Sequence, residues 1–315
     1  MGTFIIRRVF MAVIVVFIVS IISFLLLQLV PGGDPVRGML GLEANQEAVD
    51  DMRQELWLDR PIIVQYIHWA GNALKGDFGK SMRYREKVVD LIRQRLPVTL
   101  HLASLALIIA ALLGITGGII CAIKRGSVLD QTISVFSNGA VAVPIFWLGI
   151  LGIYLFSLTL GWLPTQGYTS PMDNFWLSAK RVIMPVICMS LPTLAMMTRQ
   201  TRSAMLEVVR QDYVRTAWSK GLTEQRVIIR HALKNALIPI VTLLGLGLPH
   251  LAAGSVLMET VFNVPGMGRL LVGAVLDKDF IVVQAAVLII GIIISFANLV
   301  VDISYGLLDP RIRYQ

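Results

Sequence analysis

The chain has 315 residues, of which 56% are hydrophobic and 15% are charged, and its mean hydropathy is +0.72. Soluble globular domains carry about 25% charged residues, so this composition excludes a chain that is soluble throughout. The net charge is +8, but the basic residues lie beside apolar runs and do not alternate with aromatic residues. That distribution argues against a nucleic-acid partner and is typical of a membrane protein with basic cytoplasmic loops.

The first apolar run covers residues 9–30, directly after Arg7 and Arg8, and ends at Pro31. About 20 apolar residues are needed for a helix to cross the hydrocarbon core of a bilayer. A secretory signal peptide has a shorter apolar region, followed by a cleavage site of small residues. We therefore predict that residues 1–30 form an uncleaved first transmembrane helix with its N-terminus in the cytoplasm.

Residues 31–97 are polar and contain no run long enough for a span. Ten basic residues balance ten acidic ones in this segment, which suits a loop on the outer side. Apolar residues recur at helical spacing in two groups, namely Val49, Met52 and Leu56, and then Ile62, Tyr66, Trp69 and Ala73 after Pro61. The pattern predicts a small external lobe, residues 31–94, that contains two short amphipathic helices.

Five further apolar runs follow, at 98–123, 133–160, 181–197, 237–257 and 280–305. Residues 198–236 carry eight Lys and Arg against three acidic residues, a net charge of +5, which predicts a cytoplasmic segment. Basic residues also follow the runs 98–123 and 280–305, and they mark two more cytoplasmic ends. The sequence thus predicts an all-α, polytopic membrane protein with six transmembrane helices and both termini in the cytoplasm.

Proline and glycine inside these runs predict kinks or close helix contacts. The residues concerned are Pro144, Pro185, Pro192, Gly114, Gly117 and Gly118. Gly114 and Gly118 form a GxxxG pair. We interpret all six as packing residues rather than as substrate ligands.

Nothing in the sequence predicts a catalytic centre. Gly79-Lys80-Ser81 resembles the end of a phosphate-binding loop, but that motif requires glycine at position 74, where the chain has Leu74. The two cysteines and four histidines lack the spacing of metal ligands. Asp302, near the end of the last run, is a candidate functional charge or a structural cap. We expect a non-catalytic protein without a cofactor or a metal site.

The most informative segment is the predicted cytoplasmic stretch 212–222. It predicts a helix that carries Asp212, Tyr213, Arg215, Thr216, Ala217 and Lys220 and that ends at Gly221. Tyr213, Ala217 and Lys220 are expected to share one face, with Thr216 beside them, and Gly221 to supply a turn with φ > 0 or a close backbone approach. Such a helix suits a rigid element held by another protein, or a basic amphipathic hairpin resting on anionic lipid. Composition leaves both interpretations open.

This segment resembles the loop called EAA in the permease subunits of binding-protein-dependent ABC importers, in the form of the dipeptide, oligopeptide, glutathione and nickel branch. The resemblance covers almost the whole chain. Its further motifs are Leu29-Val30-Pro31 with Asp34-Pro35, Gly76-Asp77-Phe78-Gly79-Lys80-Ser81, Arg95-Leu96-Pro97-Val98-Thr99-Leu100, Gly161-Trp162-Leu163-Pro164, Glu259-Thr260-Val261-Phe262 with Pro265-Gly266-Met267-Gly268-Arg269, and Asp309-Pro310-Arg311-Ile312-Arg313.

The loop departs from the general family pattern at a few positions. Arg215 and Thr216 stand where the general loop has Glu and Ala, whereas Ala217 and Gly221 match. Lys234 occupies the family's later proline position. The peptide branch commonly shows this form, so the resemblance still implies a loop that couples to an ATPase.

The resemblance implies the type I importer permease fold, in the bacterial inner membrane, with a transport core at 95–302 and a cytoplasmic tail at 303–315. It implies four kinds of partner: a second homologous permease subunit, two ATP-binding subunits, a periplasmic or lipid-anchored solute-binding protein, and membrane lipid. It also implies an external gate, for which the candidates are Glu259, Phe262, Pro265 and Gly266.

The expected function is ATP-driven import of short peptides, with glutathione or chelated nickel as alternative substrates of the same machine. The rival class is a secondary transporter or channel driven by an ion gradient. Such a protein would use acidic or histidine residues in mid-membrane, and the apolar runs contain almost none.

Overall fold

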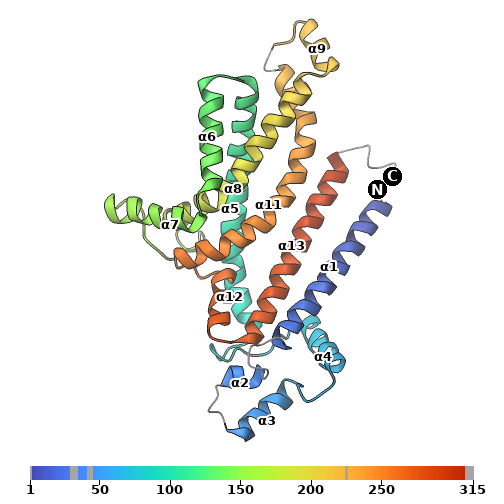
Figure 1. Cartoon of the computed structure of the whole chain (residues 1–315), viewed down its shortest axis with the longest axis vertical. Helices are drawn as coiled ribbons and strands as arrows, with labels where there is room; N and C mark the ends of the chain where they lie inside the picture. The colour runs from blue at the N-terminus through green and yellow to red at the C-terminus, as the bar shows by residue number, and fades with distance from the viewer. Residues whose placement is uncertain (1, 29–34, 41–44, 224–225, 309–315) are drawn as a thin grey trace. The chain divides into compact units, whose positions relative to one another are not determined.

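The computed structural model describes residues 2–28, 35–40, 45–223 and 226–308. Within these residues the regular structure is helical and no strand occurs, apart from one isolated bridge between Lys80 and Lys87, so the predicted all-α class is confirmed. The elements are α1 (Gly2–Gln28), α2 (Pro35–Leu40), α3 (Gln46–Glu55), α4 (Ile62–Leu74), α5 (Val88–Ile123), α6 (Val128–Ala142), α7 (Ile145–Gly152), the π-helix η1 (Ile153–Thr159), α8 (Phe175–Val209), α9 (Asp212–Ser219), the π-helix η2 (Val227–Leu233), α11 (Lys234–Val261), α12 (Met267–Leu276) and α13 (Phe280–Leu308) (Figure 1).

The chain forms two compact units, each with its own packing. The first unit comprises Met1–Arg8, Leu100–Val264 and Phe296–Gln315. The second unit comprises Val9–Thr99 and Pro265–Ser295. Helices α1, α5 and α13 contribute residues to both.

Four helices among the described residues are long and apolar enough to cross a membrane: Phe4–Gln28, Val88–Ile123, Phe175–Val209 and Phe280–Ser304. They contain or closely match the predicted spans 9–30, 98–123, 181–197 and 280–305. The predicted span 237–257 lies inside α11, which has 28 residues and a length of about 42 Å. The count of six spans and the side on which the termini lie stay predictions.

The predicted span 133–160 is not one straight helix. Helices α6 and α7 meet at an angle of 102°, and they count as one broken span or a re-entrant loop (Figure 1). Pro144 lacks an N–H and disfavours helical backbone at Val143, whose ψ is 131°, so the helix ends there. The predicted kink at Pro144 is confirmed. Pro185 and Pro192, in contrast, lie inside the continuous helix α8.

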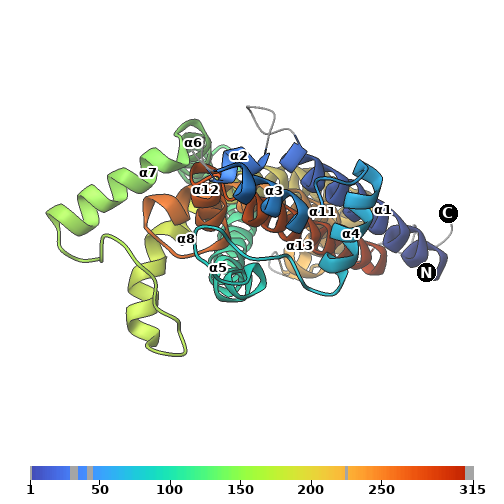
Figure 2. The same ribbon diagram turned by 90° about the horizontal axis from the view of Figure 1, so that it is seen from below.

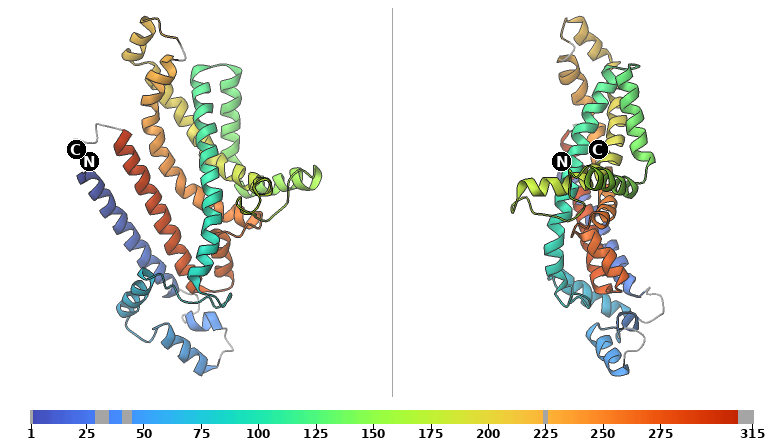
Figure 3. Two further views of the ribbon diagram at one scale, coloured as in Figure 1. Left: turned by 180° about the vertical axis from the view of Figure 1, so that it is seen from behind. Right: turned by 90° about the vertical axis from the view of Figure 1, so that its left-hand side faces the viewer.

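The GxxxG pair marks a close crossing of α5 and α8 in the first unit (Figure 3). A Cβ atom added to Gly114 would lie 2.6 Å from the Cβ of Met197, and one added to Gly118 would lie 2.4 Å from the Cβ of Thr201. Real Cβ atoms essentially never approach closer than 3.0 Å. Glycine is therefore required at both positions, which confirms the predicted close helix contact.

A buried ion pair joins α6 to the other side of α8. Arg202 donates from Nε and Nη2 to the two carboxylate oxygens of Asp130, each at 2.8 Å. The Asp130 side chain is only 6% exposed, and it also accepts a hydrogen bond from the backbone N–H of Gly126 at 3.0 Å. Bidentate pairs of this kind fix both distance and orientation. Helix α8 therefore contacts both α5 and α6 through residues of one short stretch, from Met197 to Arg202.

The second unit contains the predicted external lobe. Helices α3 and α4 coincide with the two predicted amphipathic helices, and α2 is a third that the pattern did not predict (Figure 2). The side chain of Asn45 caps α3 by accepting a hydrogen bond from the N–H of Ala48. Helix α4 packs on α1 through ring contacts of Phe24 with Tyr66 and Trp69 at 5.5 and 5.9 Å between centroids. These aromatic contacts fix the lobe to the first transmembrane helix.

Candidate functional site

The predicted coupling segment forms helix α9, which follows α8 after a connection of two residues. Asp212 lies in its first turn, where a carboxylate interacts favourably with the helix dipole. The hydroxyls of Thr216 and Ser219 donate to the carbonyls of Asp212 and Arg215, at 2.9 and 3.1 Å. The chain therefore passes from the 35-residue helix α8 into a short second helix with little slack between them.

One face of α9 is packed against the chain itself. Val214 and Ala217 are buried with Val227 of η2, and Val208 and Leu222 pack at the edge of the cluster. Ala217 lies one helical turn from Tyr213, but the chain itself covers it, with only 5% of it exposed, whereas Tyr213 and Lys220 are exposed. Residues 214 and 217 are three apart and turn to the same side of the helix. This packing gives α9 a fixed orientation.

The rest of the surface of α9 is exposed. It carries five of the residues predicted for coupling, namely Asp212, Tyr213, Arg215, Thr216 and Lys220, and in addition Trp218. Tyr213 is 44% exposed, and its hydroxyl accepts a hydrogen bond from the side chain of Asn235 at 2.8 Å. Trp218 is 43% exposed and was not singled out from the sequence, although a large aromatic residue in a strongly basic segment is a signal. Exposed aromatic and basic side chains together are typical of a protein-binding surface.

Gly221 ends this segment in the left-handed conformation, with φ of +74°. Its N–H donates to the carbonyl of Trp218 at 2.9 Å. The predicted turn with φ > 0 is confirmed. A Cβ atom at this position would meet nothing within 4 Å, so the need for glycine within the chain is conformational and not steric. A close approach by a partner stays a prediction.

The four external gate candidates occupy two places. Glu259 and Phe262 lie at the C-terminal end of α11, where both are buried, and the carbonyl of Phe262 accepts a hydrogen bond from the N–H of Gly167 at 2.9 Å. Pro265 and Gly266 precede α12, and Gly266 is the N-cap residue of that helix. In this conformation Glu259 and Phe262 contact protein and not solvent.

The loop between η1 and α8 is tied to its surroundings. Arg181 donates to the carbonyl of Tyr168 at 3.1 Å and to the hydroxyl of Thr169 at 2.6 Å. The Tyr168 hydroxyl lies 3.0 Å from Nδ1 of His101. Partial burial, with a smaller contribution from the negative charge of Asp173, raises the pKa of Tyr168. This loop, which is predicted to lie on the outer side, is thus held in place by polar contacts that the sequence did not indicate.

The sequence Gly79-Lys80-Ser81 serves a structural role. The Ser81 hydroxyl donates to the buried carboxylate of Asp279 at 2.5 Å, and Asp279 also accepts the N–H of Val282 in the first turn of α13. Ser81 is therefore engaged within the protein, and its environment differs from that of a phosphate-binding loop. Asp302 forms an ion pair with Arg8 at 3.1 Å, which agrees with the structural interpretation.

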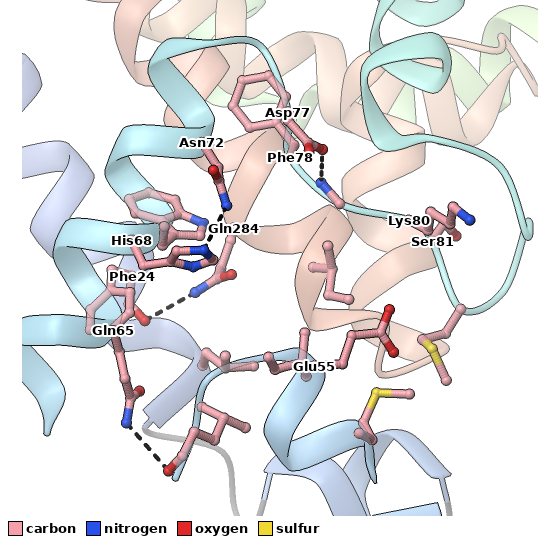
Figure 4. Close-up of a pocket in the computed structure, with 18 of the residues that line it drawn as sticks. Phe24, Glu55, Gln65, His68, Asn72, Asp77, Phe78, Lys80, Ser81 and Gln284 are labelled. Atoms are coloured by element: carbon pink, nitrogen blue, oxygen red, sulfur yellow. Dashed lines mark hydrogen bonds between the residues drawn. The ribbon is translucent and has the colours of Figure 1, made fainter. Parts of the chain in front are cut away.

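A hollow of about 600 Å³ lies in the second unit, among residues of α1, α3, α4, the 77–85 segment and α13 (Figure 4). Its walls are partly apolar, with Phe24, Trp69 and Phe78, and its edges carry charges of both signs. Glu55 and Lys80 make no ion pair within the described part of the chain. Nowhere in the described residues do three His, Cys, Asp or Glu side chains form a group that could hold a metal ion.

Comparison with known proteins gives consistent matches along the chain. The family described as "Binding-protein-dependent transport system inner membrane component" matches residues 114–314, and its N-terminal counterpart matches residues 1–103. A probable peptide ABC transporter permease of Sinorhizobium fredii is 40% identical over 314 residues, with all of both chains covered. A putative peptide transport system permease of Brucella abortus is 42% identical over 316 residues, again with all of both chains covered.

Two further comparisons extend this result. A di/tripeptide transport system permease of Pseudomonas aeruginosa is 39% identical over 336 residues, with both chains fully covered. Among solved structures, a chain of the inward-facing MetNI methionine ABC transporter superposes with a TM-score of 0.53 and 17% identity. The match covers 68% of this chain and 96% of that one, and at this identity it bears on the fold alone.

Proposed function

Because the chain belongs to the family of inner-membrane components of binding-protein-dependent transport systems, we propose that it transports short peptides. As a member of that family it is a multi-pass permease subunit of an ABC importer, and it works with a separate ATPase and a binding protein. Three relatives of 39–42% identity along the whole chain carry peptide or di/tripeptide transport in their names. These names favour peptides over glutathione or chelated nickel.

The proposed complex contains a second homologous permease subunit, two ATP-binding subunits, and a periplasmic or lipid-anchored solute-binding protein. The substrate path would lie between the two permease subunits. Within this chain, residues 1–30 would form the N-terminal helix, 31–94 the external lobe, 95–302 the transport core and 303–315 the cytoplasmic tail. The charge balance of the lobe and the +5 charge of residues 198–236 support this division.

The observation that carries the coupling proposal is the construction of α9. Its inner face is packed on η2, whereas Tyr213, Trp218 and Lys220 are exposed and would contact an ATPase. A movement of the bound ATPase would displace α9 as a rigid body and, through the two-residue connection, displace α8. Helix α8 would then carry α5 and α6 with it, because the glycine contacts and the Asp130–Arg202 pair hold these helices together.

The four external gate candidates are proposed to act by repacking. Glu259 and Phe262 are buried, so in this conformation they restrain the end of α11 rather than contact a substrate. Gly266, as the N-cap of α12, marks a position where the chain changes direction after Pro265. A change between inward-facing and outward-facing states would alter the surroundings of these residues first.

The substrate assignment is tested with the purified complex in proteoliposomes, supplied with its binding protein and a radiolabelled dipeptide. Unlabelled di- and tripeptides are expected to compete with uptake at micromolar concentrations. Glutathione and a nickel chelate, at the same concentrations, are expected to compete poorly. Stronger competition by either of these two would replace the peptide assignment and leave the importer assignment intact.

A further inference from the structure

Two hollows, each of about 390 Å³, lie beside α8 in the first unit, one between α6 and α8 and the other between α8 and the turn that carries Arg125. One is lined by Ser134, Asn138, Arg199, Arg202, Ser203 and Leu206. The other is lined by Arg125, Ser203, Leu206, Glu207, Arg210 and Gln211. The two hollows share Ser203 and Leu206, and we call the surface formed by all their lining residues the arginine groove.

The arginine groove carries an excess of positive charge. Four arginines line it, and Glu207 is the one carboxylate among its lining residues. Asp130 lies next to the groove, and Arg202 already neutralises its charge, because Nε and Nη2 of Arg202 each lie 2.8 Å from one of its carboxylate oxygens. Arg125, Arg199 and Arg210 are exposed and make no ion pair with any residue that the structure describes. The groove therefore attracts an anion.

The remaining polar groups suit a phosphate. Ser203 and Asn138 are exposed hydrogen-bond donors without a partner in the described chain, and they line the same hollow as Arg199. Guanidinium groups bind phosphate oxygens with charge-assisted hydrogen bonds, often two at a time. The ion pair between Arg202 on α8 and Asp130 on α6 holds these two helices at a fixed distance beside the groove. The ligand chemistry is thus that of a phosphate group bound by arginine, hydroxyl and amide.

The position of the groove favours a lipid as the source of this phosphate. Arg199 is the first basic residue after the apolar run 181–197, at the predicted cytoplasmic boundary. On α6, Val135 and Phe136 point to other sides of the helix than Ser134 and Asn138, and they are 69% and 76% exposed, which suits a helix surface in contact with acyl chains. Basic pockets between transmembrane helices on the cytoplasmic side bind anionic headgroups.

We propose that the arginine groove binds the headgroup phosphate of an anionic phospholipid from the cytoplasmic leaflet. Arg199, Ser203 and Asn138 contact the phosphate, and Arg125 and Arg210 attract it along the groove. Arg199 and Ser203 lie on α8 about four and about two and a half turns before the start of α9, so a bound lipid links α6 to α8 on the helix that leads into the coupling helix. This inference goes beyond the proposed function and does not depend on which substrate is carried.

The test uses the intact complex, delipidated in a neutral detergent and titrated with phosphatidylglycerol, with native mass spectrometry as the readout of bound lipid. Arg199→Gln combined with Ser203→Ala is expected to weaken binding at least about tenfold, because charge-assisted hydrogen bonds are lost. Arg230→Gln is the matched control. It removes an exposed arginine from the same basic segment but outside the groove, and it is expected to bind like the wild type.

Three further arms make the result decisive. Arg199→Lys keeps the charge but loses the paired guanidinium hydrogen bonds, so it is expected to bind more weakly than the wild type and more tightly than the double variant, which separates charge from a folding defect. Phosphatidylcholine, and inorganic phosphate at millimolar concentration, are expected neither to bind nor to displace phosphatidylglycerol. Any one of five results would overturn the proposal. Three concern the variants: equal binding by the double variant and the wild type, equal weakening by Arg230→Gln, or loss of binding in Arg199→Lys. Two concern the ligands: binding of phosphatidylcholine as tight as that of phosphatidylglycerol, or displacement of phosphatidylglycerol by inorganic phosphate.

Discussion

The crossing of α5 and α8 allows a sharp test in which two neighbouring glycines are compared. In Gly118→Ala the new Cβ atom would lie 2.4 Å from the Cβ of Thr201 and 2.7 Å from the carbonyl oxygen of Thr198. The first of these atoms must move by about 0.6 Å to reach the closest separation that real Cβ atoms show, and the second belongs to the backbone. In Gly117→Ala the nearest atoms lie at 3.6 Å, which is ordinary contact.

The difference between the two variants isolates the packing cost. Both gain about 1 kcal/mol of helix propensity when glycine becomes alanine, so this gain cancels in the comparison. Overpacking in a tight contact costs about 1–3 kcal/mol. We therefore expect Gly118→Ala to be less stable than Gly117→Ala by about 1–3 kcal/mol.

The measurement is denaturant-induced unfolding of the purified complex in detergent, followed together with ATP-driven uptake in proteoliposomes. Gly118→Ala is expected to unfold at a lower denaturant concentration and to lose uptake, whereas Gly117→Ala behaves as the wild type or is slightly more stable. Equal stability and equal uptake of the two variants would refute the close α5–α8 contact and the role that we give it in coupling.

Four further predictions follow from the same structure. Gly221→Val is expected to insert in the membrane but to lose substrate-stimulated ATPase activity, because a β-branched residue at φ of +74° costs at least about 1–2 kcal/mol; normal transport would contradict this. Ala217→Asp is expected to unfold α9 locally and to raise its proteolysis, because the carboxylate would be buried beside Val214, and an unchanged digestion pattern would argue otherwise. Asp130→Asn is expected to destabilise the complex, and the exchange Asp130→Arg with Arg202→Asp to recover part of the loss in unfolding experiments. Finally, a reporter fused after Arg215 is expected to read as cytoplasmic and one fused within residues 40–90 as external; the reverse result at either place contradicts the predicted topology.

The long elements of the fold follow from the sequence, because an apolar run of 20 or more residues has few alternatives to a helix. The break at Pro144 was also predictable as a position, since proline removes an N–H from the helix. The angle of 102° between the helices on either side of the break was not predictable, because it depends on how α7 packs against residues distant in the chain.

The structure of the coupling segment was also only partly predictable from the sequence. Its helix, its exposed polar residues and the φ > 0 turn at Gly221 follow from residue types and spacing. The burial of Ala217 does not, because the residue that covers it is Val227, on a different element. The Asp130–Arg202 pair joins residues 72 positions apart, and a single sequence contains no signal that brings them together.

The most direct test of the account uses proteoliposomes that contain the complete complex, with its binding protein outside and ATP trapped inside. Labelled dipeptide is expected to accumulate above its external concentration only when ATP and the binding protein are both present. Vesicles that contain this permease without its ATPases are expected to show no accumulation. Accumulation by the permease alone under an imposed proton or sodium gradient would contradict the assignment as an ATP-driven importer.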